Sequence, residues 1–212
     1  MQSLLQRTLK KMLDSRIRPL IDPPLNAAAR LLAKTGTSPN TVTIAGFCIG
    51  LGAFAALFFQ LYAAAALLIA VNRIFDGLDG ALARAEKRVS DLGGFLDIVT
   101  DFIFYAGIVF FFAAGQPETA LAAAFLIFSF TGSGVSFLSY AIIAAKRGVV
   151  SEKQGKKSFF YVAGLAEGTE TVAALLLICL LPQYFTVIAL VFGTACWLTA
   201  LGRVYQAFRD FS

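Results

Sequence analysis

Four aspartates in an apolar part of the chain are the residues whose type and spacing suggest chemistry. Asp76 and Asp79 lie in the segment FDGLDGALAR, at residues 75–84, and Asp97 and Asp101 follow closely. A spacing of three or four residues places both members of each pair on one face of a helix. Carboxylates are costly in or beside a membrane and usually mark a functional site there. We therefore expect the two pairs to face each other across neighbouring helices.

Carboxylates that converge in this way repel one another strongly unless some are protonated or cations lie between them. The chain contains no His, and a set of oxygen ligands favours hard divalent ions such as Mg²⁺ or Mn²⁺. Two such ions are the usual arrangement for stabilising the attacking and leaving oxygens of a phosphoryl displacement. A simpler interpretation stays open, in which the acids only form ion pairs with nearby basic residues, namely Arg73, Arg84, Lys87 or Arg88.

The composition indicates which elements must position these acids. The 212 residues are 58% hydrophobic and 15% charged, whereas a soluble domain has about 25% charged residues. We therefore expect an all-α, polytopic membrane protein. Its net charge of +5 is explained better by membrane topology and anionic lipid than by nucleic acid, so no nucleic-acid partner is expected.

Six segments are long and apolar enough to cross a membrane. They cover residues 39–59, 62–84, 93–114, 118–145, 160–181 and 184–206. With six spans, all 18 Lys and Arg residues fall on one side, and the positive-inside rule then places both termini in the cytoplasm.

The N-terminal segment, residues 1–36, differs from the six-span domain at 37–212. Apolar and basic residues alternate in it at helical spacing, with interruptions at Pro19 and at Pro23 and Pro24. This pattern predicts one or two short amphipathic helices lying on the membrane surface. Ser38 and Pro39 then provide an N-cap and a first helical residue for the first span.

The spacing of the acids resembles the signature of the CDP-alcohol phosphotransferases, which are integral membrane enzymes of phospholipid synthesis. The matching residues are Asp76, Asp79, Gly80, Ala83, Arg84, Gly93, Asp97 and Asp101, which together span 26 residues. The six-span count and the segment SPNTVT at 38–43 also resemble this family. The resemblance therefore covers most of the chain.

The resemblance implies a role for each matching residue. Asp76, Asp79 and Asp97 would hold two divalent ions. Asp101 would lie at the second ion and act as the general base toward the acceptor hydroxyl. Contacts to a CDP-lipid would come from Asn40, Thr41, Val42, Thr43, Gly80, Arg84 and Ser90.

The reaction implied is transfer of a phosphatidyl group from CDP-diacylglycerol, or a related CDP-lipid, to a small polar acceptor, with release of CMP. Because family members often dimerise, a homodimer is expected. The expected location is the bacterial inner membrane, with the active site on the cytoplasmic side.

The acceptor is the least defined part of this interpretation. The branch of the family that uses inositol phosphate usually carries an Arg early in the fifth span, where this chain has AEGTETV at 166–172 and no basic residue past Lys157. An inositol phosphate acceptor is therefore disfavoured. Lys156 and Lys157 either bind a phosphate of the acceptor or only mark the cytoplasmic side of the membrane and contact anionic lipid. Glu167 and Glu170 either form buried hydrogen bonds or contact the acceptor, in which case a polyol or an amino alcohol is favoured.

Three other functions are compatible with some of these features. An enzyme of the same family could donate a small CDP-alcohol headgroup to a lipid hydroxyl, because the signature does not fix the direction of transfer. A divalent-cation transporter would also use acids between helices, but its site should lie near the bilayer midplane. A non-catalytic relative would not be expected to keep all four aspartates together with Arg84.

Overall fold

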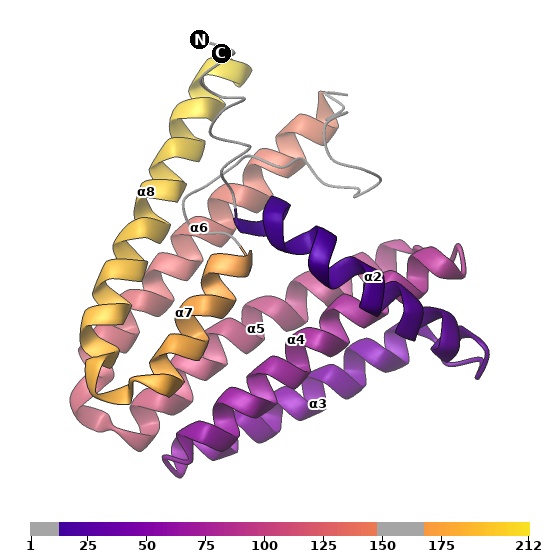
Figure 1. Cartoon of the computed structure of the whole chain (residues 1–212). Coiled ribbons are helices and arrows are strands. Elements are labelled where there is room, and N and C mark those ends of the chain that lie inside the picture. Colours follow the sequence, from indigo (N-terminus) through magenta and orange to yellow (C-terminus); the bar gives the residue numbers. More distant parts are fainter. Residues whose placement is uncertain (1–12, 148–167) are drawn as a thin grey trace.

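The computed structural model describes residues 13–147 and 168–212, and the regular structure in these ranges is helical. The predicted all-α fold is confirmed for this part of the chain. The long helices run side by side (Figure 1), and their bounds are α2 (Leu13–Ala33), α3 (Pro39–Phe58), α4 (Tyr62–Ala85), α5 (Asp91–Gly115), α6 (Ala120–Lys146), α7 (Gly168–Leu180) and α8 (Phe185–Phe211). Short 3₁₀ turns, η1 (Pro117–Thr119) and η2 (Pro182–Tyr184), precede α6 and α8.

Within the described residues, four helical segments are long and apolar enough to cross a membrane. They are α3, α5, η1 with α6, and η2 with α8. Helix α4 has 24 residues but carries two arginines and two aspartates from its middle, at Arg73, to its C-terminal end. The described part of α7 has 13 residues, and its predicted beginning lies outside the described residues. The count of six spans therefore stays a prediction.

Local sequence explains where the helices nearest the acids begin and end. Ser38 accepts a hydrogen bond from the Thr41 amide and Pro39 is the first residue of α3, so the predicted N-cap is confirmed. Ser90 caps α5 in the same way through the Gly93 amide. Helix α2 runs without a break from Leu13 to Ala33, so its prolines do not divide it.

Helix α2 packs against α4 through a small apolar cluster, and Figure 1 shows it lying over that helix. Ala29 of α2 is buried there with Val42 of α3 and with Ala81 and Leu82 of α4. This contact fixes the half of α4 that carries the aspartates. These contacts join the N-terminal segment to the bundle. The domain boundary at residue 36 stays a prediction.

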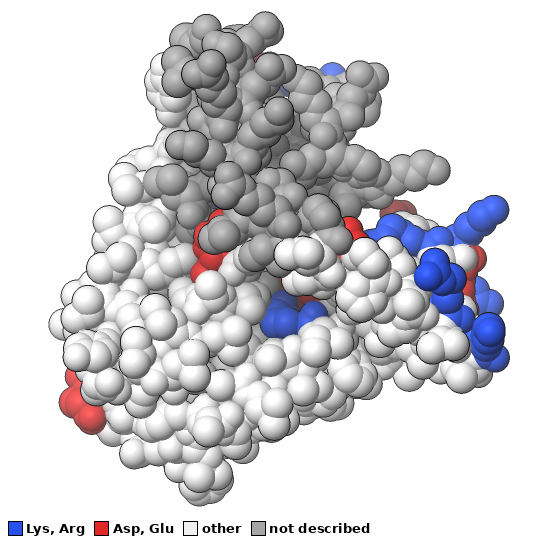
Figure 2. Space-filling model, in the orientation of Figure 1, with Lys and Arg blue, Asp and Glu red and all other residues white. Residues whose placement is uncertain are grey.

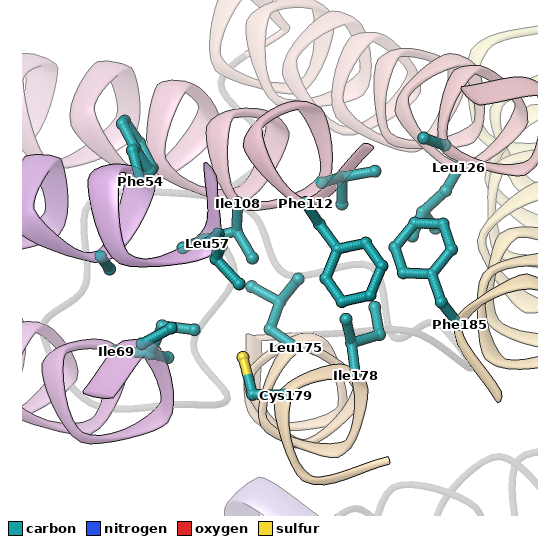
Figure 3. Close-up of a cluster of buried hydrophobic side chains, with 14 of the residues drawn as sticks. Phe54, Leu57, Ile69, Ile108, Phe112, Leu126, Leu175, Ile178, Cys179 and Phe185 are labelled. Atoms are coloured by element: carbon teal, nitrogen blue, oxygen red, sulfur yellow. The ribbon is translucent and has the colours of Figure 1, made fainter. Parts of the chain in front are cut away.

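The main hydrophobic core lies in the half of the bundle away from the aspartates. Figure 3 shows side chains of α3, α4, α5, α6, α7 and α8 converging in it. The rings of Phe112 and Phe185 stack with their centroids 4.2 Å apart, and Leu175 and Ile178 of α7 are fully buried beside them. A tightly packed core of this kind holds the helices rigidly, so the opposite half can carry polar groups.

The surface matches an environment of lipid along the helices. Large apolar side chains such as Phe110, Leu121 and Val191 are exposed. Figure 2 shows a broad face with few charges, with most of the visible Lys and Arg at one edge and a smaller basic group in a hollow of that face. Contiguous exposed apolar surface on this scale is typical of a membrane protein rather than of a soluble one.

Candidate active site

Both aspartate pairs lie in the halves of α4 and α5 that join at the short connection, residues 86–90. The two helices pack mainly on α3 and not closely on each other. Asp76 is nevertheless within electrostatic range of Asp79, Asp97 and Asp101. The structure therefore places the four predicted acids in one region, with α3 as the common support of the helices that carry them.

Arg73 lies between the two helices and is the main partner of the acids in this structure. Its Nη1 is 2.7 Å from Oδ1 of Asp101 and 3.6 Å from Oδ2 of Asp76. The hydroxyl of Tyr105 donates to the other oxygen of Asp101 at 3.2 Å. The ion-pair interpretation thus holds for Arg73, whereas Arg88 pairs with Glu86 at 3.4 Å.

The rest of the guanidinium is held by neighbours that carry no charge. Its Nε and Nη2 both donate to Oδ1 of Asn72, at 2.8 and 2.6 Å. Asn72 in turn donates to the Gly46 carbonyl of α3 at 2.7 Å. The Phe104 ring lies 4.6 Å from the guanidinium carbon. Arg73 is therefore fixed by the fold rather than placed loosely at a surface.

Asp79 has a neutral partner. The Thr43 hydroxyl of α3 donates to its Oδ2 at 2.5 Å. A cavity of about 10 Å³ lies here, lined by Thr43, Asp76, Asp79 and Thr100 among others. This volume is about that of a single water or ion.

The donors fit a hard divalent ion in their chemistry, because they are carboxylates with a hydroxyl beside them. Within the described residues, however, no three acidic side chains lie close enough together to hold an ion as they stand. Arg73 explains why the acids are not arranged around an ion, because its guanidinium forms ion pairs with Asp76 and Asp101. Ion binding would therefore require a change in these side chains.

A larger cavity of about 230 Å³ adjoins the acids between α5, α6, α7 and α8. Asp97 and Asp101 line it from α5, and aromatic rings form much of its wall. Such a cavity has room for a small polar molecule and lies directly beside the predicted base. Sequence reasoning did not find it, because its walls come from segments far apart in the chain.

Arg203 of α8 lines the same cavity and is buried, with 7% of its surface exposed. Its Nη1 donates to the Ser133 carbonyl at 2.9 Å and to the Ser133 hydroxyl at 3.2 Å. The Phe137 ring lies 5.4 Å from the guanidinium carbon. In the sequence, Arg203 counts only toward the positive-inside pattern. Its position inside the last apolar span is the signal that could identify it.

The remaining predicted CDP-lipid contacts lie at the ends of α3, α4 and α5. A Cβ on Gly80 would be 3.2 Å from Nη1 of Arg84, so this glycine leaves room for the arginine. The Asn40 side chain lies near Gly93 at the start of α5. Val42 is buried in the apolar cluster with α2, so its side chain does not face an open site.

Of the predicted acceptor contacts, only Glu170 lies within the described residues. Lys156, Lys157 and Glu167 lie outside the described residues. Oε2 of Glu170 is buried with no hydrogen-bond partner among the residues described, and Glu170 does not line the larger cavity although Gly168 and Thr171 do. An acceptor contact from Glu167 or Glu170 stays a prediction.

Comparison with known proteins identifies the family. Residues 36–203 match the family model described as CDP-alcohol phosphatidyltransferase. The chain is 45% identical over 198 residues to the inner membrane protein YnjF of Escherichia coli, covering 93% of this chain and 96% of that protein. It is 44% identical over 101 residues to an archaetidylinositol phosphate synthase of Pyrococcus horikoshii, covering 48% of this chain and 54% of that protein.

Solved structures share the fold. The phosphatidylinositol phosphate synthase of Mycobacterium tuberculosis with CDP-DAG bound superposes with a TM-score of 0.71 at 18% identity, covering 85% of this chain and 92% of that one. The same enzyme in complex with manganese and citrate gives a TM-score of 0.68 at 19% identity, covering 87% and 88%.

Proposed function

The chain belongs to the CDP-alcohol phosphatidyltransferase family, and we propose that it transfers a phosphatidyl group from CDP-diacylglycerol, or a related CDP-lipid, to a small polar acceptor. The observation that carries this proposal is the position of Asp101. Its carboxylate belongs to the acid cluster, through Arg73, and also lines the 230 Å³ cavity. A base placed there would face an acceptor on one side and the donor phosphate on the other.

The donor would bind where α3, α4 and α5 begin or end near one another. Arg84, lying over Gly80, can bind a phosphate with two parallel hydrogen bonds. Thr43 and Asn40 face the same region from α3. The M. tuberculosis relative with CDP-DAG bound supports a CDP-lipid as donor.

Asp76, Asp79, Asp97 and Asp101 would hold two divalent ions, Mg²⁺ or Mn²⁺. When bound, such ions neutralise the diphosphate and make the acceptor hydroxyl more acidic. The relative in complex with manganese supports a divalent metal. Thr43, which holds Asp79 by a hydrogen bond, would keep that carboxylate oriented toward the site.

Asp101 would accept the proton of the acceptor hydroxyl. The acceptor oxygen then forms a bond to the phosphorus of the phosphatidyl group, and the bond from that phosphorus to the CMP oxygen breaks. CMP leaves with the electron pair of the broken bond. Tyr105, which donates to Asp101 in this structure, would hold the carboxylate in position for the transfer.

The acceptor is proposed to carry an anionic group, of which phosphate is the simplest. Arg203 supports this, because it brings a buried positive charge to the cavity that Asp101 lines. The name of the P. horikoshii relative points to a phosphorylated inositol, whereas the missing Arg in the fifth span disfavours inositol phosphate, so phosphate is proposed here as a chemical class only. Glu167 lies outside the described residues and Glu170 does not line the cavity, so an acceptor contact from these glutamates, which would favour a polyol or an amino alcohol, is a separate prediction.

In the membrane, α4 and α7 would complete a bundle of six spans with α3, α5, α6 and α8. Both termini and the site would then lie on the cytoplasmic side, where the basic residues gather. A homodimer is part of the same proposal. The similarity to an inner membrane protein of E. coli supports the location.

An acceptor panel tests the proposal. Purified protein is incubated with CDP-diacylglycerol, Mg²⁺ and one acceptor at a time, and the lipid product is identified by mass. We expect a product with inositol phosphate or glycerol 3-phosphate and much less with inositol, glycerol or serine. A product only with uncharged acceptors would contradict the anionic acceptor, and a product only from a CDP-alcohol and a lipid hydroxyl would reverse the direction of transfer.

A further inference from the structure

We propose that Arg73 is a resident counter-cation of the acid cluster, which balances Asp76 and Asp101 in the metal-free protein and competes with a divalent ion for them. The inference rests on the proposed function, because it assumes that these carboxylates hold metal. It goes beyond that function, because it assigns to Arg73 a role in setting how tightly the ion binds.

The geometry places Arg73 where an ion would otherwise be needed. Its Nη1 reaches one oxygen of Asp101 at 2.7 Å and one of Asp76 at 3.6 Å, so a single cation connects the acids of α4 and α5. The Arg73 side chain is 13% exposed. At that depth the attraction is screened far less than it would be at a surface.

The fold holds this cation from the side opposite the acids. Asn72 accepts from two guanidinium nitrogens and is itself held by the Gly46 carbonyl. Phe104 and Tyr105 lie against the guanidinium, with ring centroids 4.6 and 5.2 Å from its central carbon. The planar fork of an arginine suits such bonding on several sides, whereas a lysine ammonium would not. Arg73 is therefore a built part of the site.

Asp101 and Asp79 therefore differ in the charge of their hydrogen-bond partners. Both oxygens of Asp101 have partners, Arg73 on one and Tyr105 on the other. An ion that takes Asp101 as a ligand must displace a positive charge. The partner of Asp79 is the neutral hydroxyl of Thr43, so an ion there meets no such competitor. We therefore infer that the two ions bind with unequal affinity, and that Arg73 weakens the second.

The test is Mn²⁺ binding to the full chain in detergent, followed by the electron paramagnetic resonance signal of free Mn²⁺. In Arg73→Met we expect the weaker of two Mn²⁺ sites to tighten by about tenfold or more, because a like charge has been removed from its ligands. Arg73→Lys should tighten the site less than Arg73→Met does, because it keeps the positive charge although it loses the bonds to Asn72. Arg88→Met is the matched control, since it removes one positive charge from an exposed pair with Glu86, and its Mn²⁺ affinity should not change.

A second readout is the thermal midpoint in excess chelator. Arg73→Met should lower it relative to the wild type, because Asp76 and Asp101 lose their counter-charge, and saturating Mn²⁺ should remove most of the difference. Should Arg73→Met fail to fold, Arg73→Gln applies the same criterion, since its amide can still bond to Asn72 and Asp101.

The outcomes separate the two proposals. A wild type that binds no Mn²⁺ would remove the metal site of the proposed function. A wild type that binds Mn²⁺, together with equal or weaker binding in the neutral variants of Arg73, would overturn the role of Arg73 as a competitor. It would instead make Arg73 a support that the metal site needs.

Discussion

Asp101 is the residue at which the two parts of the site meet. It is bonded to Arg73 within the acid cluster, and it also lines the cavity proposed for the acceptor. Asp76 and Asp79 lie on α4 and do not line the larger cavity. Asp97 and Asp101 line it from α5, and of these two Asp101 is the residue proposed to accept the proton of the acceptor.

Arg203 gives a prediction at the scale of one residue. Arg203→Gln should raise the KM for a phosphorylated acceptor at least tenfold, because a hydrogen bond to a charged group contributes about 1.5–3 kcal/mol. The apparent affinity for the CDP-lipid should stay within about twofold, since Arg203 lies on the far side of the cavity from α4 in the proposed arrangement. Initial rates at varied acceptor and varied donor measure both.

Arg209→Gln is the matched control, because Arg209 lies on the same helix two turns nearer the C-terminus and is exposed. Its kinetics should equal those of the wild type. An unchanged acceptor KM in Arg203→Gln would mean that Arg203 has a structural role and does not contact the acceptor.

At the scale of elements, α3 is the support that fixes the acids of α4. Thr43 of α3 bonds to Asp79, and the Gly46 carbonyl bonds to Asn72 next to Arg73. A Cβ on Gly46 would lie 2.8 Å from the Phe75 Cβ, closer than real contacts allow. The two helices therefore approach each other only because this position has no side chain.

Gly46→Val should separate α3 from α4 and disturb both hydrogen bonds at once. We expect a lower thermal midpoint and weaker Mn²⁺ binding than in the wild type, although no predicted ligand has been changed. Gly202→Ala is the control, because nothing lies within 4 Å of a Cβ at that position. A stable Gly46→Val protein with normal Mn²⁺ affinity would show that the close approach of α3 does not position the acids.

Much of this arrangement follows from local sequence, and the rest depends on contacts between distant segments. The spacing of the aspartates and the cap at Ser38 are local patterns. The helices predicted at 39–59, 62–84 and 93–114 agree with α3, α4 and α5. The packing of α4 and α5 on α3 is not local. Neither is the contact of Arg203 with Ser133, which joins residues 70 positions apart. No periodicity in a single sequence reports the relative rotation of two helices.

Arg73 shows the same limit at a shorter distance. The sequence places it one turn before Asp76, and an ion pair between them was an open alternative. Its stronger bond is instead to Asp101, on the next helix. That preference depends on Asn72 and the aromatic rings behind the guanidinium, which the sequence alone does not place.

At the scale of the whole molecule, the hydrophobic core and the charged residues of the site lie in different parts of the described bundle. The main core fills one half of the bundle, and the acids, Arg73 and Arg203 lie toward the other. An enzyme that joins a lipid donor to a water-soluble acceptor needs its site near the membrane surface. This separation agrees with such a site.

The proposed topology predicts the sides of the membrane on which three points lie. Reporters fused at the N-terminus and at the C-terminus should both be cytoplasmic, and a cysteine introduced at Glu118 should react with an impermeant reagent from outside. Glu118 lies in η1, between α5 and α6. Termini on opposite sides would exclude an even number of spans.

The most direct test of the account compares Asp101→Asn with the wild type in a single assay of CMP release and lipid product. The substitution keeps size and shape but removes the proton acceptor. We expect the wild type to release CMP from CDP-diacylglycerol only with acceptor and Mg²⁺ or Mn²⁺, and to stop in excess chelator. In Asp101→Asn we expect CDP-lipid binding to persist while the transfer rate falls at least about 100-fold, the usual contribution of a positioned base. Transfer at a near-normal rate in that variant, or full activity in excess chelator, would contradict the account.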